Sequence, residues 1–208
     1  MATGGEAFGP LEAIVLAGGA GARFGGAKLT HPWRDGALIE GALAAAFASP
    51  ARCVTVVTGA DPKVEAATRA FADRLGNAAR LRVVHCIQHA EGMGATLRAG
   101  VASLPPDTKG AFVFLGDMPL IPPAILPALV AALASGAPAA APIFQGQRGH
   151  PVLFSASLFP RLLEAVGDEG ARRALSELGD RLATIKTDDP GVIFDVDRPD
   201  DMDEPTAW

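Results

Sequence analysis

The sequence predicts an α/β protein in which a mostly parallel sheet carries helices on both faces. The first observation is that short apolar runs alternate with helical segments over residues 11–134. The second is a glycine-rich loop directly after the first of these runs, and the third is Asp117, directly after a later run. Ligands of such sheets bind at the carboxyl ends of the strands, so we expect the loop and Asp117 at the same edge.

The first two strand–helix units follow from residue type and spacing. Residues 13–16 form an apolar run that ends in glycines, which is typical of a buried strand that opens into a tight loop. Residues 38–48 are apolar and rich in alanine, as expected of a helix. Every residue of Val54–Thr58 is β-branched, which predicts the second strand. Residues 61–75 predict a helix with an aspartate cap ahead of a proline.

The next elements repeat this alternation as far as residue 134. Residues 81–87 and 111–115 predict the third and fourth strands, and residues 93–103 and 122–134 predict the helices that follow them. The pattern then changes to a small hairpin excursion, two short helical stretches and a last strand. These are expected at 139–144 with 152–154, at 158–166 and 169–178, and near 183–187.

Length and charge limit the classes of protein that this chain can be. With 208 residues, 49% of them hydrophobic, the chain can form one domain with a full core. We expect this domain at residues 11–208, after a flexible N-terminus at residues 1–10. The formal net charge of −5 argues against a surface for nucleic acid or an anionic membrane. Neither a signal peptide nor a membrane-spanning run is evident, which predicts a cytoplasmic protein.

The cysteines predict a reducing compartment. Cys53 and Cys86 both lie beside apolar runs and are expected to be small buried side chains without a disulfide. His85 and His89 lie near Cys86, but no second cysteine pair or further histidine completes a tetrahedral zinc set. The chain has no tyrosine, which excludes mechanisms that need a phenol.

The glycine loop suits a polyphosphate. Residues 16–29 read Leu-Ala-Gly-Gly-Ala-Gly-Ala-Arg-Phe-Gly-Gly-Ala-Lys-Leu, so free backbone amides lie between two cations, Arg23 and Lys28. A Walker A loop is excluded because Lys28 is followed by leucine instead of Ser or Thr. A dinucleotide fingerprint fails because Phe24 stands where its third glycine is needed. The loop therefore predicts a nucleoside triphosphate site of another kind.

Two acidic segments predict a magnesium site beside this loop. Asp117 follows a buried strand where the strand meets solvent, and a carboxylate there suits Mg²⁺ that also binds phosphate oxygens. A second ligand is expected from the C-terminal segment, in which alternation places Asp195 and Asp197 on one face of an extended chain. We favour Asp197, although either could bind the metal. The further acidic residues are expected to be a solvated tail: Asp200, Asp201, Asp203 and Glu204.

Two more loops carry candidate binding residues. Gly92 and Gly94 open a helix that also contains Thr96, so a base or ribose could lie against the backbone there. Arg148 and His150 stand in the polar turn of the predicted hairpin and could meet a second substrate. A plain loop-to-helix junction and a solvated histidine are the alternatives.

Four segments together resemble the molybdenum cofactor cytidylyltransferase family. They are the glycine loop, Glu-Gly-Met-Gly-x-Thr-Leu-Arg-Ala-Gly at 91–100, Gly-Asp-Met-Pro at 116–119 and Gly-His-Pro-Val-Leu-Phe at 149–154. The closing Asp-Val-Asp-x-Pro-x-Asp and the Pro-Trp pair after the loop are similar to that family too, so the resemblance spans nearly the whole chain. Gly18 and Thr96 depart from it, because alanine and serine are common at those places.

The resemblance implies a Rossmann-like nucleotidyltransferase fold and assigns expected roles. The nucleotide would contact the glycine loop and the second glycine segment, through Leu16, Ala17, Gly18, Gly19, Gly21, Arg23, Lys28, Gly92, Gly94 and Thr96. Arg23, Lys28 and Asp117 would be catalytic, and Asp117 with Asp197 would bind Mg²⁺. Arg148, Gly149 and His150 would face the pterin.

The reaction implied is transfer of CMP from CTP to molybdopterin, with release of pyrophosphate. The alternatives are GTP as the donor, or a sugar phosphate as the acceptor. From other classes, an NAD(P)-dependent oxidoreductase and a non-catalytic protein that hands the cofactor to a molybdoenzyme remain to be distinguished. A molybdoenzyme or its chaperone is a possible partner of the enzyme as well.

Overall fold

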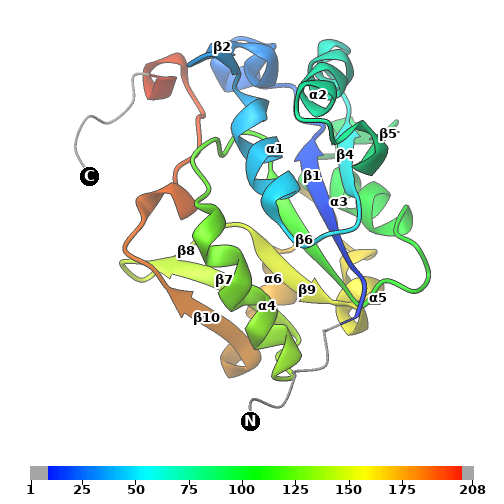
Figure 1. Cartoon of the computed structure of the whole chain (residues 1–208), viewed down its shortest axis with the longest axis vertical. Helices are drawn as coiled ribbons and strands as arrows, with labels where there is room; N and C mark the ends of the chain where they lie inside the picture. The colour runs from blue at the N-terminus through cyan, green and yellow to red at the C-terminus, as the bar shows by residue number, and fades with distance from the viewer. Residues whose placement is uncertain (1–8, 203–208) are drawn as a thin grey trace.

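A computed structural model describes residues 9–202 of the chain. Its main sheet has eight strands, seven of them in the order β10, β7, β9, β6, β1, β4, β5, with β8 paired to β7 (Figure 1). The strands are β1 (Leu11–Ala17), β4 (Val54–Thr58), β5 (Leu81–His85), β6 (Gly110–Leu115), β7 (Ala139–Phe144), β8 (Gln147–Arg148), β9 (Val152–Ser155) and β10 (Leu182–Lys186). The predicted α/β class is therefore confirmed.

β1 lies at the centre of the sheet and is buried along its whole length. It pairs in parallel with β4 on one side and with β6 on the other. Its side chains alternate between two cores: Ala13 and Val15 pack on one face, and Ile14 and Leu16 on the other. A strand buried on both faces explains why the run before the glycine loop is apolar throughout.

Helices cover both faces, as the alternation predicts. One core contains α1 (Ile39–Ala48), α2 (Lys63–Arg74) and α4 (Leu126–Ala134). The other contains α3 (Met93–Ala102) with two short helices, α5 (Phe159–Leu162) and α6 (Arg172–Ser176). The predicted aspartate at the start of α2 accepts a hydrogen bond of 2.9 Å from the Lys63 amide. No helix within residues 9–202 is long and apolar enough to cross a membrane.

The hairpin predicted after residue 134 is part of the main sheet and not a separate excursion. β9 is antiparallel to β7, as a hairpin requires, but it also pairs with β6 and so lies between β6 and β7. The Val-Leu-Phe sequence of β9 is buried, which suits a place inside a sheet. The two helical stretches expected at 158–166 and 169–178 are shorter in the structure, as α5 and α6. Gly170, with a φ of 51°, interrupts the second stretch before α6 begins.

A small antiparallel ribbon after the glycine loop was not expected from the sequence. β2 (Pro32–Trp33) pairs with β3 (Gly36–Ala37). Trp33 joins a third apolar cluster with Phe24, Leu38 and Val196. The C-terminal segment therefore lies beside β2, as Figure 1 shows. This cluster brings the C-terminal segment next to the glycine loop, which contributes Phe24.

Other expectations have mixed outcomes. Cys86 is buried and Cys53 half-buried, and both are free thiols. Within residues 9–202, no three His, Cys, Asp or Glu side chains gather in a way that could hold a metal. At the predicted flexible N-terminus, residues 1–8 lie outside the described range, whereas the Pro10 carbonyl accepts a hydrogen bond from the Lys109 amide. Asp203 and Glu204 also lie outside that range.

Candidate active site

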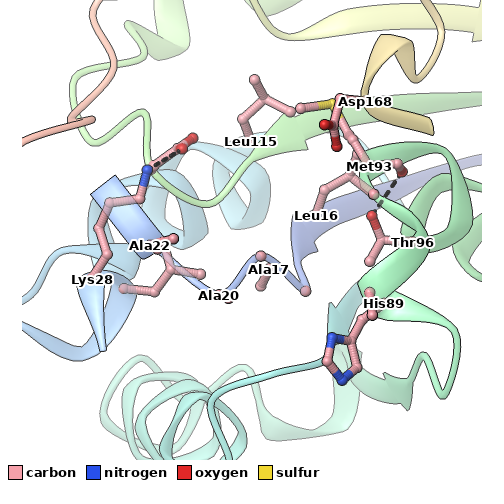
Figure 2. Close-up of a pocket in the computed structure, with 17 residues that line it drawn as sticks. Leu16, Ala17, Ala20, Ala22, Lys28, His89, Met93, Thr96, Leu115 and Asp168 are labelled. Carbon is pink, nitrogen blue, oxygen red and sulfur yellow. Dashed lines mark hydrogen bonds and ion pairs between the residues drawn. The ribbon is translucent and has the colours of Figure 1, made fainter. Parts of the chain in front are cut away.

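A pocket of about 610 Å³ opens at the carboxyl ends of β1 and β6 (Figure 2). The glycine loop lines its centre, and residues from the start of α3 line one end. The lining residues are Leu16, Ala17, Gly18, Gly19, Ala20, Gly21, Ala22, Lys28, Leu29, His89, Ala90, Gly92, Met93, Thr96, Leu115, Asp117 and Asp168. The sheet thus brings together the loop and Asp117, as its parallel topology predicts.

The backbone of the loop needs its later glycines. Gly21, Gly25 and Gly26 have φ values of 61°, 94° and 98°, which side chains with a Cβ rarely adopt. The Gly21 carbonyl accepts hydrogen bonds from the amides of Phe24 and Gly26, which closes a turn around the arginine. Phe24 is buried in the third apolar cluster and anchors the turn, whereas the Arg23 side chain is 77% exposed.

Lys28 is held between two carboxylates. Its ammonium lies 2.7 Å from Asp117 Oδ2 and 3.5 Å from Asp197 Oδ1. The Lys28 side chain is only 12% exposed, so these charges interact more strongly than a surface pair would. Arg23 also contacts Asp197, at 3.0 Å, but its side chain is 77% exposed. The structure therefore gathers both cations of the loop around the two predicted metal ligands.

The C-terminal segment reaches this site through apolar packing and backbone hydrogen bonds. Val196 is fully buried, and its amide donates to the Asp117 carbonyl at 3.0 Å. Asp201 Oδ2 accepts from the amides of Asp197 and Arg198. The prediction of a solvated tail is therefore wrong for Asp201, which shapes the turn that carries Asp197. The segment is also irregular instead of extended.

Asp195 lies near the same group of charges. Its pKa is raised above the ordinary value, first by desolvation of the carboxyl group and then by the negative charges of Asp117 and Asp197. Lys28 partly opposes this effect. The negative charges of Asp117 and Asp197 thus act on Asp195 as well as on Lys28, although the ion pairs of Lys28 within residues 9–202 are with Asp117 and Asp197.

At the other end of the pocket, Thr96 is used differently from the expectation. Its hydroxyl donates to the Met93 carbonyl at 2.8 Å, so its proton already has a partner within the helix. Its methyl group faces Gly18: a Cβ added to Gly18 would overlap Thr96 Cγ2. The two departures from the family pattern are therefore in contact, and the threonine methyl occupies the space that an alanine at position 18 would need.

We expect Gly18→Ala to lower the free energy of unfolding by about 1–3 kcal/mol, because it overpacks this contact. In a Thr96→Ser background, which lacks the methyl group, the same change should cost close to nothing. Urea unfolding of the four proteins measures this as a double-mutant cycle. An equal cost of Gly18→Ala in both backgrounds would show that the contact with Thr96 does not limit position 18.

The segment after β8 is more enclosed than a solvated turn. A Cβ added to Gly149 would overlap the Val192 carbonyl, and that carbonyl accepts the His150 amide at 2.7 Å. His150 Nδ1 is buried and has no hydrogen-bond partner among the described residues. Burial lowers the pKa of His150 to about 4, so its ring is neutral at pH 7. Arg148 is exposed, and its pKa is lowered by desolvation and by Arg172.

The lowered pKa of His150 predicts loss of stability in acid. Between pH 6.5 and about 4 the unfolded chain protonates this histidine and the folded protein does not, so acid favours unfolding, by up to about 3 kcal/mol. The free energy of unfolding from urea titrations at pH 7.5 and 4.5 should therefore fall more for the wild type than for His150→Gln. Parallel pH dependence in the two proteins would contradict the assignment. The raised pKa of Asp195 instead stabilises the folded protein as the pH falls. This effect is present in both proteins, so it cancels when their pH dependences are compared.

Sequence reasoning missed several lining residues. Leu115 and His89 adjoin segments already singled out, so their places next to Asp117 and Gly92 could have indicated them. Asp168 is different, because it comes from a loop between α5 and α6 that carries no recognisable nucleotide motif. Six of the predicted residues lie outside the lining of this pocket: Arg23, Gly94, Arg148, Gly149, His150 and Asp197.

Comparisons with known proteins match most of the chain. A family model described as MobA-like NTP transferase domain matches residues 13–182. The molybdenum cofactor cytidylyltransferase of Escherichia coli strain K12 is 25% identical over 192 residues, which cover 92% of this chain and 93% of that protein.

Solved structures have the same fold. Rv0371c from Mycobacterium tuberculosis H37Rv superimposes with a TM-score of 0.74 at 25% identity, with 92% of this chain and 94% of that chain covered. A structure of Rv0371c in complex with manganese has a TM-score of 0.70 at 23% identity, covering 92% and 95% of the two chains. The main sheet and its helices are thus shared over nearly the full length of both proteins.

Proposed function

This chain belongs to the MobA-like NTP transferase family, and from that premise we propose that it transfers CMP from CTP to molybdopterin with release of pyrophosphate. The family match shows that the protein is a nucleotidyltransferase. The identity of the nucleotide base and of the acceptor is our proposal. The observation that carries it is the position of Lys28 between Asp117 and Asp197 beside the glycine loop. The name of the Escherichia coli relative supports the choice of CTP and molybdopterin.

The donor set fits a divalent cation. Asp117 and Asp197 already converge on one positive charge, the Lys28 ammonium. Two carboxylates with room for phosphate oxygens are the ligands that Mg²⁺ prefers. The manganese complex of Rv0371c also supports a divalent metal in this fold. We therefore propose that Asp117 and Asp197 hold Mg²⁺, which would neutralise charge on the triphosphate.

The residues of the chain then have distinct tasks. The amides of the glycine loop would accept the triphosphate, and Lys28 would leave the carboxylates to pair with phosphate oxygens. Arg23 is more exposed and would contact the outer phosphates. The terminal phosphate of molybdopterin would attack the α-phosphate of CTP, and the P–O bond to the pyrophosphate leaving group would break. The attacking phosphate is already ionised, so no general base is needed, and positioning with charge neutralisation would supply the catalysis.

The acceptor would approach from the side of β8. Arg148 is exposed there and lies near Arg172, and within residues 9–202 neither guanidinium has a carboxylate partner. His150 is neutral and has an unpaired nitrogen. Cationic side chains without partners suit the phosphate of the acceptor, which supports the assignment of Arg148, Gly149 and His150 to the second substrate.

Thermal stability with nucleotides is the first test. CTP, GTP, ATP, UTP and NADPH would each be added with and without Mg²⁺, and a ligand at about a hundred times its Kd should add roughly 2.7 kcal/mol. Stabilisation by CTP above the other nucleotides, and more so with Mg²⁺, is the expected result, followed by pyrophosphate release when molybdopterin is added. Preference for GTP would assign GTP as the donor instead. Stabilisation by NADPH alone, or CTP binding without pyrophosphate release, would overturn the proposal.

A further inference from the structure

Asp168 is a charged residue that the proposed reaction leaves without a task. It lines the pocket, and no hydrogen bond or ion pair to its carboxylate occurs in the described part of the chain. Figure 2 shows it beside Met93, at the end of the pocket away from Lys28. The lining of the pocket therefore has one ion pair, Lys28 with Asp117, at one end and a single unpaired carboxylate, Asp168, at the other.

The loop that carries Asp168 is built against the start of α3. A Cβ added to Gly92 would overlap Asp168 Oδ1, and a Cβ added to Gly94 would come within 2.8 Å of the Val166 amide nitrogen. Arg98 donates to the Ala165 carbonyl and also pairs with Glu91 at 2.8 Å. The space left by the missing side chains of Gly92 and Gly94 is thus taken by the loop that carries Asp168. This close packing holds Asp168 at the pocket.

The surroundings of Asp168 favour a flat ring over a sugar. The walls at this end are mostly apolar, with Leu16, Leu115 and Met93 among them, and the Thr96 hydroxyl already donates to a backbone carbonyl. A ribose would need several polar partners, whereas a base needs apolar faces and few polar groups at its edge. A carboxylate accepts hydrogen bonds and cannot donate one at neutral pH, so it selects for an amino group and against a carbonyl.

We propose that Asp168 recognises the nucleotide base by accepting a hydrogen bond from its exocyclic amino group. This inference rests on the proposed nucleotidyl transfer at the same pocket. It separates CTP from UTP, because cytosine carries an amino group where uracil carries a carbonyl oxygen. Facing that oxygen, Asp168 would be left without a donor and would repel it.

The test is direct nucleotide binding, by calorimetry in the presence of Mg²⁺, with two pairs that differ at an amino group: CTP with UTP, and GTP with ITP. If the wild type prefers pyrimidine nucleotides, it should bind CTP more tightly than UTP. If it prefers purine nucleotides, it should bind GTP more tightly than ITP. Asp168→Ala should weaken CTP by roughly ten- to hundredfold and leave UTP unchanged or improved. Asp168→Asn, whose amide can donate to a carbonyl, should narrow the preference or reverse it in favour of UTP.

Glu169→Gln is the matched control, because Glu169 is the next carboxylate on the same loop and does not line this pocket. It should leave the CTP to UTP ratio unchanged. An equal loss of CTP and UTP in Asp168→Ala would overturn a base contact and indicate a ribose contact or a displaced loop. A wild type that prefers GTP contradicts the donor proposed above, but Asp168 is then tested by the GTP to ITP ratio. A wild type that binds no nucleotide overturns both proposals.

Discussion

Asp117→Ala should lower kcat/KM for nucleotidyl transfer by roughly 10³-fold, because it removes a proposed metal ligand worth several kcal/mol of charge stabilisation. The carboxylate follows β6 and is held by Lys28 at 2.7 Å, so it stands where phosphate and metal would meet. The fold should survive, because the Asp117 side chain is 25% exposed and the backbone carbonyl that binds Val196 remains. Pyrophosphate release at saturating Mg²⁺ measures the activity, and circular dichroism checks the fold.

Asp107→Ala is the matched control. Asp107 comes shortly before β6, whereas Asp117 comes shortly after it. Both carboxylates form an ion pair, Asp107 with Arg52 and Asp117 with Lys28. Asp107 lies at the opposite end of the strand from the pocket. Its removal should leave activity within a factor of about two, since an exposed ion pair contributes little to stability. Full activity of Asp117→Ala would remove this residue from the site, whatever the control shows.

Lys28→Ala should lower kcat/KM by roughly 10²- to 10³-fold, because a nearly buried ammonium would be lost from the triphosphate. The same change should strengthen binding of Mg²⁺ or Mn²⁺ in the absence of nucleotide, since the ammonium no longer neutralises Asp117 and Asp197. Steady-state kinetics measure the first effect, and titration of Mn²⁺ followed by electron paramagnetic resonance measures the second.

Lys63→Ala provides the comparison, because Lys63 is an exposed lysine at the start of α2 and outside the pocket. It should change neither activity nor Mn²⁺ affinity. If Lys28→Ala kept its kcat/KM, Lys28 would have no part in the chemistry. If its activity fell but metal affinity did not rise, Lys28 would act on the phosphates without competing for the carboxylates.

Local patterns were enough to predict much of this fold. The apolar runs of β1, β4 and β6 are each buried on both faces, so residue type alone identifies them. The parallel order of these strands then brings the glycine loop to Asp117 without any knowledge of side-chain contacts. Asp197 was inferred from the chemistry that a second carboxylate would serve, and the structure places it 3.5 Å from Lys28.

The remaining features depend on contacts between segments that are distant in the sequence. The Val-Leu-Phe run of β9 predicts a strand but says nothing about its neighbours, and pairing with β6 is decided by the whole sheet. Asp168 enters the pocket only because Gly92 and Gly94 accommodate its loop, and Asp201 matters only because its carboxylate accepts two amides of the turn at Asp197. None of these pairings leaves a local signature.

The insertion of β9 also affects how the protein is made. During synthesis the chain completes β1, β4, β5 and β6 first, but the outer edge of β6 has no partner until residues 152–155 have left the ribosome. An uncovered, apolar strand edge is a template for unwanted pairing between chains. The nucleotide half of the sheet therefore keeps this edge open until β9 pairs with it, and β9 directly follows the segment that supplies the proposed acceptor residues. We therefore expect completion of the donor side to depend on synthesis of the acceptor side.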